Sequence, residues 1–210
     1  MPDAPMKPKK PKRRAVFLDR DGTISEEMGY VNHLSRFIIF PYAAAAIRRL
    51  NQASLPVIVV TNQSGVARNF FPESLIPQVH DKMKMELAAA GSHVDGIYYC
   101  PHIRDNNCTC RKPIPGMLEQ AAREHALDLA DSVLVSDRYD DISMGQSVGC
   151  HSILVLSGYG RGEYEYHRCD WPRQPDHVVE DLTAAVDLIL GANVTKNLGK
   201  QAGRRRRNKG

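Results

Sequence analysis

Short apolar runs recur along the chain, separated by longer segments in which polar and apolar residues are mixed. Five of these runs, each four or five residues long, are the strands we expect: 15–18, 56–60, 96–99, 132–136 and 152–156. An apolar run without alternation is typical of a parallel strand that is buried on both faces of its sheet. The pattern therefore predicts a parallel sheet covered by helices.

The segments between the runs carry helix signals, and the helices we expect cover 41–50, 73–90, 115–126, 141–149 and 182–190. Pro41 suits a first helical turn, and Gly91 suits a helix end. Residues 24–40 show no sustained period and indicate a loop, with room for a short hairpin. Alternating strands and helices predict one Rossmann-like three-layer α/β domain over residues 15–192, without internal repeats.

The net charge of +4 conceals an uneven distribution. Residues 1–14 and 196–210 together hold thirteen Lys and Arg and one Asp, which leaves 15 basic and 23 acidic residues between them, a net charge of −8. We expect 1–14 and 193–210 to be disordered basic tails. Because these ends contain no aromatic residue on which a base could stack, the pattern does not favour nucleic-acid binding.

The hydropathy pattern also bears on location. The chain contains no run of 18 apolar residues, and no apolar stretch of signal-peptide type follows the basic N-terminal segment. We therefore expect no membrane span and a cytoplasmic location.

Two acidic residues, Asp19 and Asp21, directly follow the first apolar run and precede Gly22. In open α/β sheets, ligands bind beyond the carboxyl ends of the strands. Two carboxylates one residue apart repel each other unless a cation intervenes, and Mg²⁺ is held by one or two carboxylates together with substrate phosphate. The alternative is a surface turn after a strand, in which Asp-Gly is common.

Other strand ends deliver polar residues to the same edge of the predicted sheet. Thr61 and Asn62 follow the second run, Asp137 and Asp141 follow the fourth, and Lys112 lies between them. Each could be an ordinary turn or cap residue. Together they fit a phosphate and metal site better than unrelated turns.

Three cysteines and one histidine crowd into a short stretch, at Cys100, His102, Cys108 and Cys110. Three thiolates and one imidazole fill a tetrahedral Zn²⁺ site and leave no open position, so the site would be structural. The alternative is three free thiols in a loop. Because Lys112 follows directly, we expect the zinc loop to position that lysine.

The motifs D-x-D at 19–21, Thr61, Lys112 and the acidic pair after the fourth run occur in the order found in haloacid-dehalogenase-like (HAD) phosphohydrolases. The resemblance covers roughly residues 15–160. It implies a HAD-type sheet, a monomer and the transfer of a phosphoryl group to Asp19. The short segments 24–40 and 100–110 leave no room for a large cap domain, so the site is expected to be open.

The resemblance also implies roles for individual residues. Asp19 is the nucleophile, and Asp21 is the general acid and base. Mg²⁺ is held by Asp19, Asp137 and the backbone near Asp21, whereas Thr61 and Lys112 hold phosphate oxygens. Asp141 is expected to orient Lys112 or a metal-bound water rather than to bind the metal directly.

The zinc loop C-P-H…C-x-C-R-K-P resembles two branches of the family, the D-glycero-D-manno-heptose 1,7-bisphosphate phosphatases and the histidinol-phosphate phosphatases. The segments 61–68, which ends in Arg68, and 156–160 resemble the heptose branch. Ser136, where the family usually has Gly, departs from the pattern, and Arg138 leans towards the histidinol branch. The expected substrate is a small phosphorylated sugar that loses its C7 phosphate.

A bisphosphate needs a second cationic contact, for which Arg111, Arg68 and Arg138 are candidates. Asn62 is the remaining candidate for substrate binding. Two interpretations outside the sugar phosphatases stay open. One is a zinc-ordered protein whose basic tails engage nucleic acid, and the other is a nucleic-acid 3′-phosphatase on the same scaffold.

Overall fold

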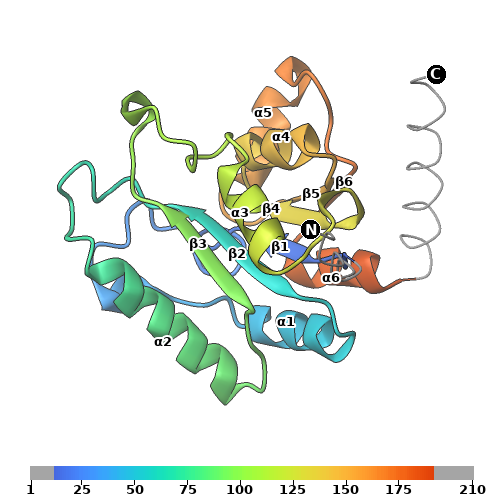
Figure 1. The fold of residues 1–210 in the computed structure, drawn as a ribbon, viewed down its shortest axis with the longest axis horizontal. Helices are drawn as coiled ribbons and strands as arrows, with labels where there is room; N and C mark the ends of the chain where they lie inside the picture. The colour runs from blue at the N-terminus through green and yellow to red at the C-terminus, as the bar shows by residue number, and fades with distance from the viewer. Residues whose placement is uncertain (1–11, 192–210) are drawn as a thin grey trace, which may run out of the picture.

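The structure is a computed structural model that describes residues 12–191. Six parallel strands form one sheet in the order β3-β2-β1-β4-β5-β6 (Figure 1). Their bounds are Val16–Leu18 (β1), Val57–Asn62 (β2), Gly96–Cys100 (β3), Val133–Ser136 (β4), His151–Val155 (β5) and His177–Val179 (β6). The expected parallel sheet is confirmed.

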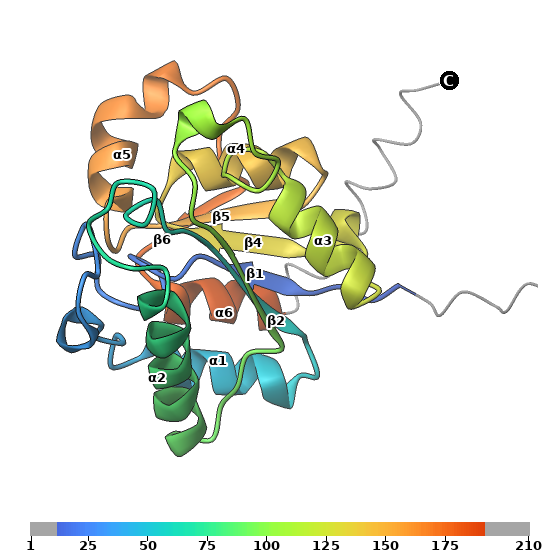
Figure 2. The same cartoon turned by 60° about the vertical axis from the view of Figure 1, so that its left-hand side comes forward.

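Helices cover both faces of this sheet, and Figure 2 shows α1, α2 and α6 on one side and α3, α4 and α5 on the other. Their bounds are Ala43–Gln52 (α1), Leu75–Ala89 (α2), Gly116–Glu124 (α3), Tyr139–Ser147 (α4), Gly160–His167 (α5) and Leu182–Leu190 (α6). The result is the three-layer α/β arrangement that the alternating pattern predicts.

The pleat of the central strand divides the hydrophobic core into two clusters. Val16 and Leu18 of β1 pack among the residues of α1, α2 and α6. Phe17, between them, points to the other face and packs against α3 and α4. Since successive strand side chains point to opposite faces, an uninterrupted apolar run is what a strand between two helical layers requires.

β1 lies at the point where the strand order changes direction. Val16 pairs with Val57 of β2 on one side and with Val133 of β4 on the other. At the end of β1, the Asp19 N–H donates to Val135 O at 3.1 Å. Ligand sites of open α/β sheets lie at such switch points, beyond the carboxyl ends of the strands.

Two elements were not expected from the sequence, namely β6 and helix α5. The segment 24–40 is largely irregular, as expected, with a 3₁₀ turn at Leu34–Arg36 and an isolated antiparallel bridge between Ser25 and Ile39. Within the described range, no helix is both long enough and apolar enough to cross a membrane.

The two expected basic tails lie almost entirely outside the described residues. Their overlap with the structure is 12–14, where the Arg13 N–H donates to Ala126 O at 3.2 Å and Arg13 O accepts from the Asp128 N–H at 2.9 Å. Arg13 also forms an isolated parallel bridge with Leu127. The residues that pack with the domain therefore begin before residue 15.

Candidate active site

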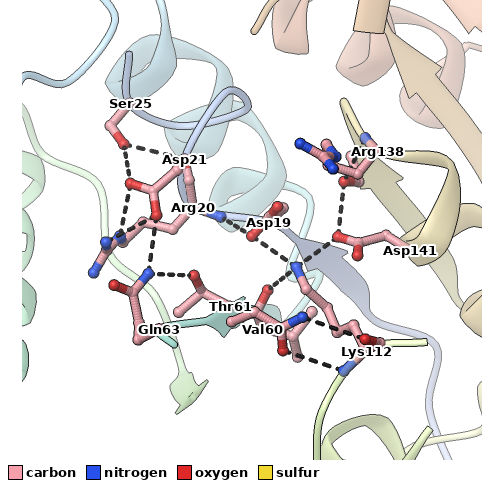
Figure 3. A network of polar contacts seen from close by, with 12 residues as sticks. Asp19, Arg20, Asp21, Ser25, Val60, Thr61, Gln63, Lys112, Arg138 and Asp141 are labelled. Carbon is pink, nitrogen blue, oxygen red and sulfur yellow. Dashed lines mark hydrogen bonds and ion pairs between the residues drawn. The ribbon is translucent and has the colours of Figure 1, made fainter. Parts of the chain in front are cut away.

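A cavity of about 310 Å³ opens at the carboxyl edge of the sheet. The expected catalytic side chains of Asp19, Asp21, Thr61 and Lys112 all line it. They come from the ends of β1 and β2 and from the segment between β3 and α3. Figure 3 shows them in one network of polar contacts.

Asp19 lies at the end of β1 with only 6% of its surface exposed. One of its oxygens, Oδ1, accepts from the Arg20 N–H at 2.7 Å and lies 2.9 Å from Lys112 Nζ. Burial raises the pKa of Asp19 to about 7, although the positive charge of Lys112 opposes that rise. A buried carboxylate with one cationic neighbour is placed to act as a nucleophile.

Lys112 is fixed by groups from three different segments. Its Nζ lies 2.6 Å from Asp141 Oδ2 and donates to Val60 O at 3.2 Å. Its backbone N–H donates to Asn62 Oδ1 at 3.1 Å. Burial alone would lower the pKa of Lys112, but the carboxylates of Asp141 and Asp19 raise it, so the ammonium stays charged.

Asp141 is in turn held by Ser136, the residue that departs from the family pattern. The Ser136 hydroxyl donates to Asp141 Oδ2 at 2.8 Å and accepts from the Arg138 N–H at 3.1 Å. All of the surface of Ser136 is buried. The serine therefore supplies the lysine's partner with a further hydrogen bond.

Asp137 is completely buried at the end of β4. Its Oδ2 accepts from the Tyr159 N–H at 2.8 Å, whereas its Oδ1 has no hydrogen-bond partner. Burial raises the pKa of Asp137 well above its usual value, and the charge of Asp19 adds to that effect. An orphaned carboxylate oxygen beside a second acidic group fits a bound divalent cation.

Two glycines make the close packing around Asp137 possible. A Cβ added to Gly22 would lie 2.1 Å from Asp137 Oδ2, and one added to Gly158 would lie 2.2 Å from the same atom. Both have positive φ, at 79° and 54°. No other residue type combines that backbone with that approach.

The carboxylate of Asp21 is surrounded by hydrogen-bond donors from the protein and does not form an open metal-binding position. Arg20 Nε donates to its Oδ1 at 3.1 Å, and Arg20 Nη2 donates to its Oδ2 at 2.8 Å. Gln63 Nε2 donates to Oδ2 at 2.9 Å, and the Ser25 hydroxyl, whose one proton is shared between two acceptors, lies 3.4 Å from Oδ1 and 3.2 Å from Arg20 O. The Asp21 carboxylate thus has a fixed orientation in the cavity wall.

Arginines that could bind the substrate now number four, because the structure adds Arg104 to the three candidates from the sequence. Three of the four line the cavity. Arg138 lies 2.9 Å from Glu163 and over the ring of Tyr159, and Arg111 donates to His102 O at 2.7 Å. Arg104, which the sequence gave no reason to select, also lines it and pairs with Asp140 at 3.0 Å. Arg68 is exposed and does not line the cavity.

A second group of ligand-type side chains lies beside the cavity. One ligand atom from each of Cys100, His102, Cys108 and Cys110 lies within 4.8 Å of all the others. The Sγ atoms of Cys100 and Cys108 are 3.6 Å apart, and His102 Nδ1 is 3.4 Å from Cys110 Sγ. Zn–S bonds of ~2.3 Å place two sulfurs of a tetrahedral site roughly 3.8 Å apart, so the donor set and its spacing fit zinc.

Sequence reasoning missed Arg20, Gln63, Arg104 and Tyr159. Arg20 is the middle residue of the D-x-D motif, and Gln63 follows Thr61 and Asn62 after the second strand. Their positions inside these motifs are the sequence signal that could have identified both residues. Arg104 is in the long connection between β3 and α3, whose course only the structure reveals, whereas Tyr159 is in the short segment between β5 and α5 and belongs to the stretch 156–160.

Comparisons with known proteins place these features in context. The sequence model of the HAD-hydrolase-like family matches residues 109–185. D-glycero-D-manno-heptose-1,7-bisphosphate 7-phosphatase of Thermosynechococcus vestitus is 39% identical over 192 residues, which cover 84% of this chain and 95% of that protein. D-glycero-beta-D-manno-heptose-1,7-bisphosphate 7-phosphatase of Bordetella bronchiseptica is 37% identical and is covered over 98% of its length.

The structural comparison agrees with the sequence comparison. The crystal structure of D,D-heptose 1,7-bisphosphate phosphatase from B. bronchiseptica, in complex with magnesium and phosphate, matches with a TM-score of 0.79 and 38% identity. The match covers 84% of this chain and 98% of that one. The likeness therefore extends over most of the described residues.

Proposed function

The chain belongs to the HAD-like phosphatases that include the D-glycero-D-manno-heptose-1,7-bisphosphate 7-phosphatases, and from this premise we propose that it removes the C7 phosphate of D-glycero-β-D-manno-heptose 1,7-bisphosphate. The observation that carries the proposal is the 36–39% identity to enzymes of that name over 95–98% of their lengths. The cavity supports it, because it combines a buried nucleophile with cationic groups.

In the first step, an oxygen of Asp19 forms a bond to phosphorus while the bond from phosphorus to the C7 oxygen breaks. Asp21 gives a proton to the leaving C7 alkoxide. Thr61 and Lys112 hold the phosphate oxygens, and the charge of Lys112 offsets the charge that accumulates on them. The product of this step is a phosphorylated Asp19.

In the second step, water attacks the phosphorus of phosphorylated Asp19. Asp21, now a carboxylate, takes a proton from that water, and the bond between Asp19 and phosphorus breaks. Inorganic phosphate leaves, and Asp21 again carries the proton that it lost in the first step. One residue therefore serves as acid and then as base.

Mg²⁺ would be held by Asp19 and Asp137, with backbone near Asp21, and it would reduce the repulsion between the anionic nucleophile and the phosphate. The orphaned Asp137 Oδ1 and the raised pKa values of both carboxylates support this assignment.

Zn²⁺ would be held by Cys100, His102, Cys108 and Cys110 as a structural ion. The role fits the position of this loop. Arg111 donates to His102 O at 2.7 Å, and Lys112 follows it in the chain. We propose that zinc fixes the course of the loop and thereby the positions of the Arg111 and Lys112 side chains.

The second phosphate of the substrate would meet Arg111. Arg138 and Arg104 each already pair with a carboxylate, whereas Arg111 donates to the backbone carbonyl of His102. The Arg111 Nε is buried without a hydrogen-bond partner. Arg111 is therefore the cavity arginine with the most capacity left for an anion.

We further propose that the protein is a cytoplasmic monomer whose partner is this small sugar phosphate rather than a nucleic acid. All five cysteines lie in the described residues and are free thiols. A reducing compartment keeps such thiols available for a metal.

The first experiment measures phosphate release in Mg²⁺ from heptose 1,7-bisphosphate, histidinol phosphate and a 3′-phosphorylated oligonucleotide. Asp19→Asn provides the blank, because the change removes the nucleophile's charge at nearly constant volume. We expect kcat/KM to be at least about tenfold higher for the bisphosphate, since histidinol phosphate lacks the second phosphate that Arg111 would bind and the oligonucleotide is much larger than the cavity of about 310 Å³. A preference for either of the others would contradict the proposed substrate.

A further inference from the structure

The Asp21 carboxylate receives three hydrogen bonds from Arg20 and Gln63. Arg20 donates one bond to each oxygen, and Gln63 donates a second to Oδ2. The Ser25 hydroxyl lies 3.4 Å from Oδ1 and 3.2 Å from Arg20 O, and its one proton can be donated to only one of them. A carboxylate offers about four lone-pair sites. Protein donors thus occupy most of the accepting capacity of the group that is to exchange a proton with substrate and water.

Arg20 is an unusual partner because it is buried. Only 1% of its surface is exposed, and its guanidinium lies over the ring of Phe37 at 5.6 Å. Within residues 12–191, Asp21 is the one carboxylate that pairs with it. Separating this pair would leave a buried guanidinium without a counter-charge, which costs several kcal/mol in typical proteins. The pair therefore holds Asp21 at one place in the cavity wall.

Gln63 connects Asp21 to the phosphate site. The Gln63 amide nitrogen faces Asp21, and Nε2 donates to Asp21 Oδ2 at 2.9 Å. The second hydrogen of that nitrogen is directed at Thr61 Oγ1, at 2.9 Å. Thr61 accepts this bond, which leaves its own hydroxyl proton free to point at a phosphate oxygen. The backbone of Gln63 is itself fixed, because its N–H donates to Cys100 O at 2.7 Å.

We propose that Arg20 and Gln63 are positioning residues for proton transfer at Asp21, and that Gln63 also sets the direction in which the Thr61 hydroxyl donates. This inference rests on the proposed function, in which Asp21 protonates the leaving alkoxide. When Asp21 acts, one protein donor gives way to the substrate or to water, while the Arg20 fork keeps the carboxylate in place.

The test compares two leaving groups. An alkoxide departs poorly without a proton, whereas p-nitrophenolate departs readily without one. We expect Gln63→Leu and Arg20→Lys to lower kcat/KM for heptose 1,7-bisphosphate by at least about tenfold more than for p-nitrophenyl phosphate, since general acid catalysis contributes typically 10²–10⁴-fold. The ratio kcat/KM reports the steps up to departure of the leaving group, which include this proton transfer.

Two substitutions at exposed positions serve as matched controls, Gln78→Leu and Arg36→Lys. Neither residue lines the cavity, so neither change should alter the ratio between the two substrates. A melting curve is measured for each variant to show that it folds. If Arg20→Lys does not fold, the test is read from Gln63→Leu and its control only. An equal loss on both substrates, or no loss on either, overturns the inference.

Failure of the proposed substrate is visible separately, in the wild-type protein. If it hydrolyses p-nitrophenyl phosphate but not the heptose, the alkyl arm is repeated with glycerol 3-phosphate, and the leaving-group comparison proceeds. If Asp19→Asn retains activity on both substrates, the covalent mechanism and this inference fail together.

Discussion

At the scale of single residues, the site depends on how closely other atoms approach Asp137. Gly22 and Gly158 lie against the same carboxylate oxygen, and both have backbone conformations that side chains rarely adopt. A side chain at either position would have to displace the carboxylate that we assign to the metal. The two glycines therefore matter for chemistry as well as for the turns that contain them.

Gly22→Ala tests this dependence. The added Cβ would lie 2.1 Å from Asp137 Oδ2, so the carboxylate must move. We expect stability to fall by about 2 kcal/mol or more, since the positive φ alone costs roughly 1–2 kcal/mol, and we expect the Mg²⁺ concentration for half-maximal activity to rise. Urea denaturation and a magnesium titration of activity measure the two effects.

Gly91→Ala is the matched control. Its φ of 72° is close to the 79° of Gly22, but its added Cβ would meet only Arg48 Cδ, at an ordinary 3.8 Å. Gly91→Ala should lose only the stability that the positive φ costs, and its Mg²⁺ concentration for half-maximal activity should stay at the wild-type value. If the two variants lose the same stability and show the same magnesium dependence, the close approach of Gly22 to Asp137 does not matter for metal binding.

Single residues also show which parts of the site could be predicted from the sequence and which could not. The spacing of Asp19, Asp21 and Lys112 along the chain identified them, because strand ends converge at one edge of a parallel sheet. The Ser136–Asp141 hydrogen bond and the Arg20–Asp21 pair depend on burial and side-chain direction, which a pattern does not contain. Arg68 shows the converse, since it was selected from a sequence motif but its side chain is exposed and does not line the cavity.

At the scale of elements, the predictions succeeded where hydrophobic periodicity was strong. Helix α6 and the five expected strands lie within about two residues of their predicted bounds, as is usual for such boundaries. Helix α5 was missed because only Gly160 among its residues is buried, so no apolar face shows in its sequence. β6 was missed because it has three residues, none of them fully buried.

If zinc binds as we propose, the loop from β3 to α3 is the element whose stability should depend most on a metal. Between residues 100 and 112 it contains one short 3₁₀ turn, Arg104–Asn106, and few apolar side chains. Cys108→Ser removes one of four ligands, so we expect zinc content to fall, the melting temperature to drop by about 5 °C or more, and kcat/KM to decrease as Arg111 and Lys112 lose their support.

Cys169→Ser provides the control for this variant, because Cys169 is exposed and belongs to no cluster of possible metal ligands in the described chain. Elemental analysis and thermal melts are read together. A melting curve for Cys108→Ser that coincides with the wild-type curve would contradict a structural role for zinc.

At the scale of the whole molecule, we predict that the domain needs residues 12–14 for full stability but neither 1–11 nor 192–210. A chain cut to 12–191 should match the full chain in melting temperature and kcat/KM. A chain cut to 15–191 loses both backbone hydrogen bonds of Arg13, each worth about 0.5–1.5 kcal/mol, and should unfold at lower urea. Equal stability of the two shorter chains would show that the Arg13 bridge contributes nothing.

The position of β1 in the middle of the sheet also governs the order in which activity can arise during synthesis. Asp19 emerges from the ribosome early, but Lys112 and Asp137, which lie near it in the folded site, follow much later in the chain. Until β4 pairs with β1, one edge of β1 lacks its partner, and unpaired strand edges promote aggregation. The nascent chain thus carries the carboxylate that we propose as the nucleophile long before that group can act, and the chain is most prone to aggregate until the second half of the sheet pairs with β1.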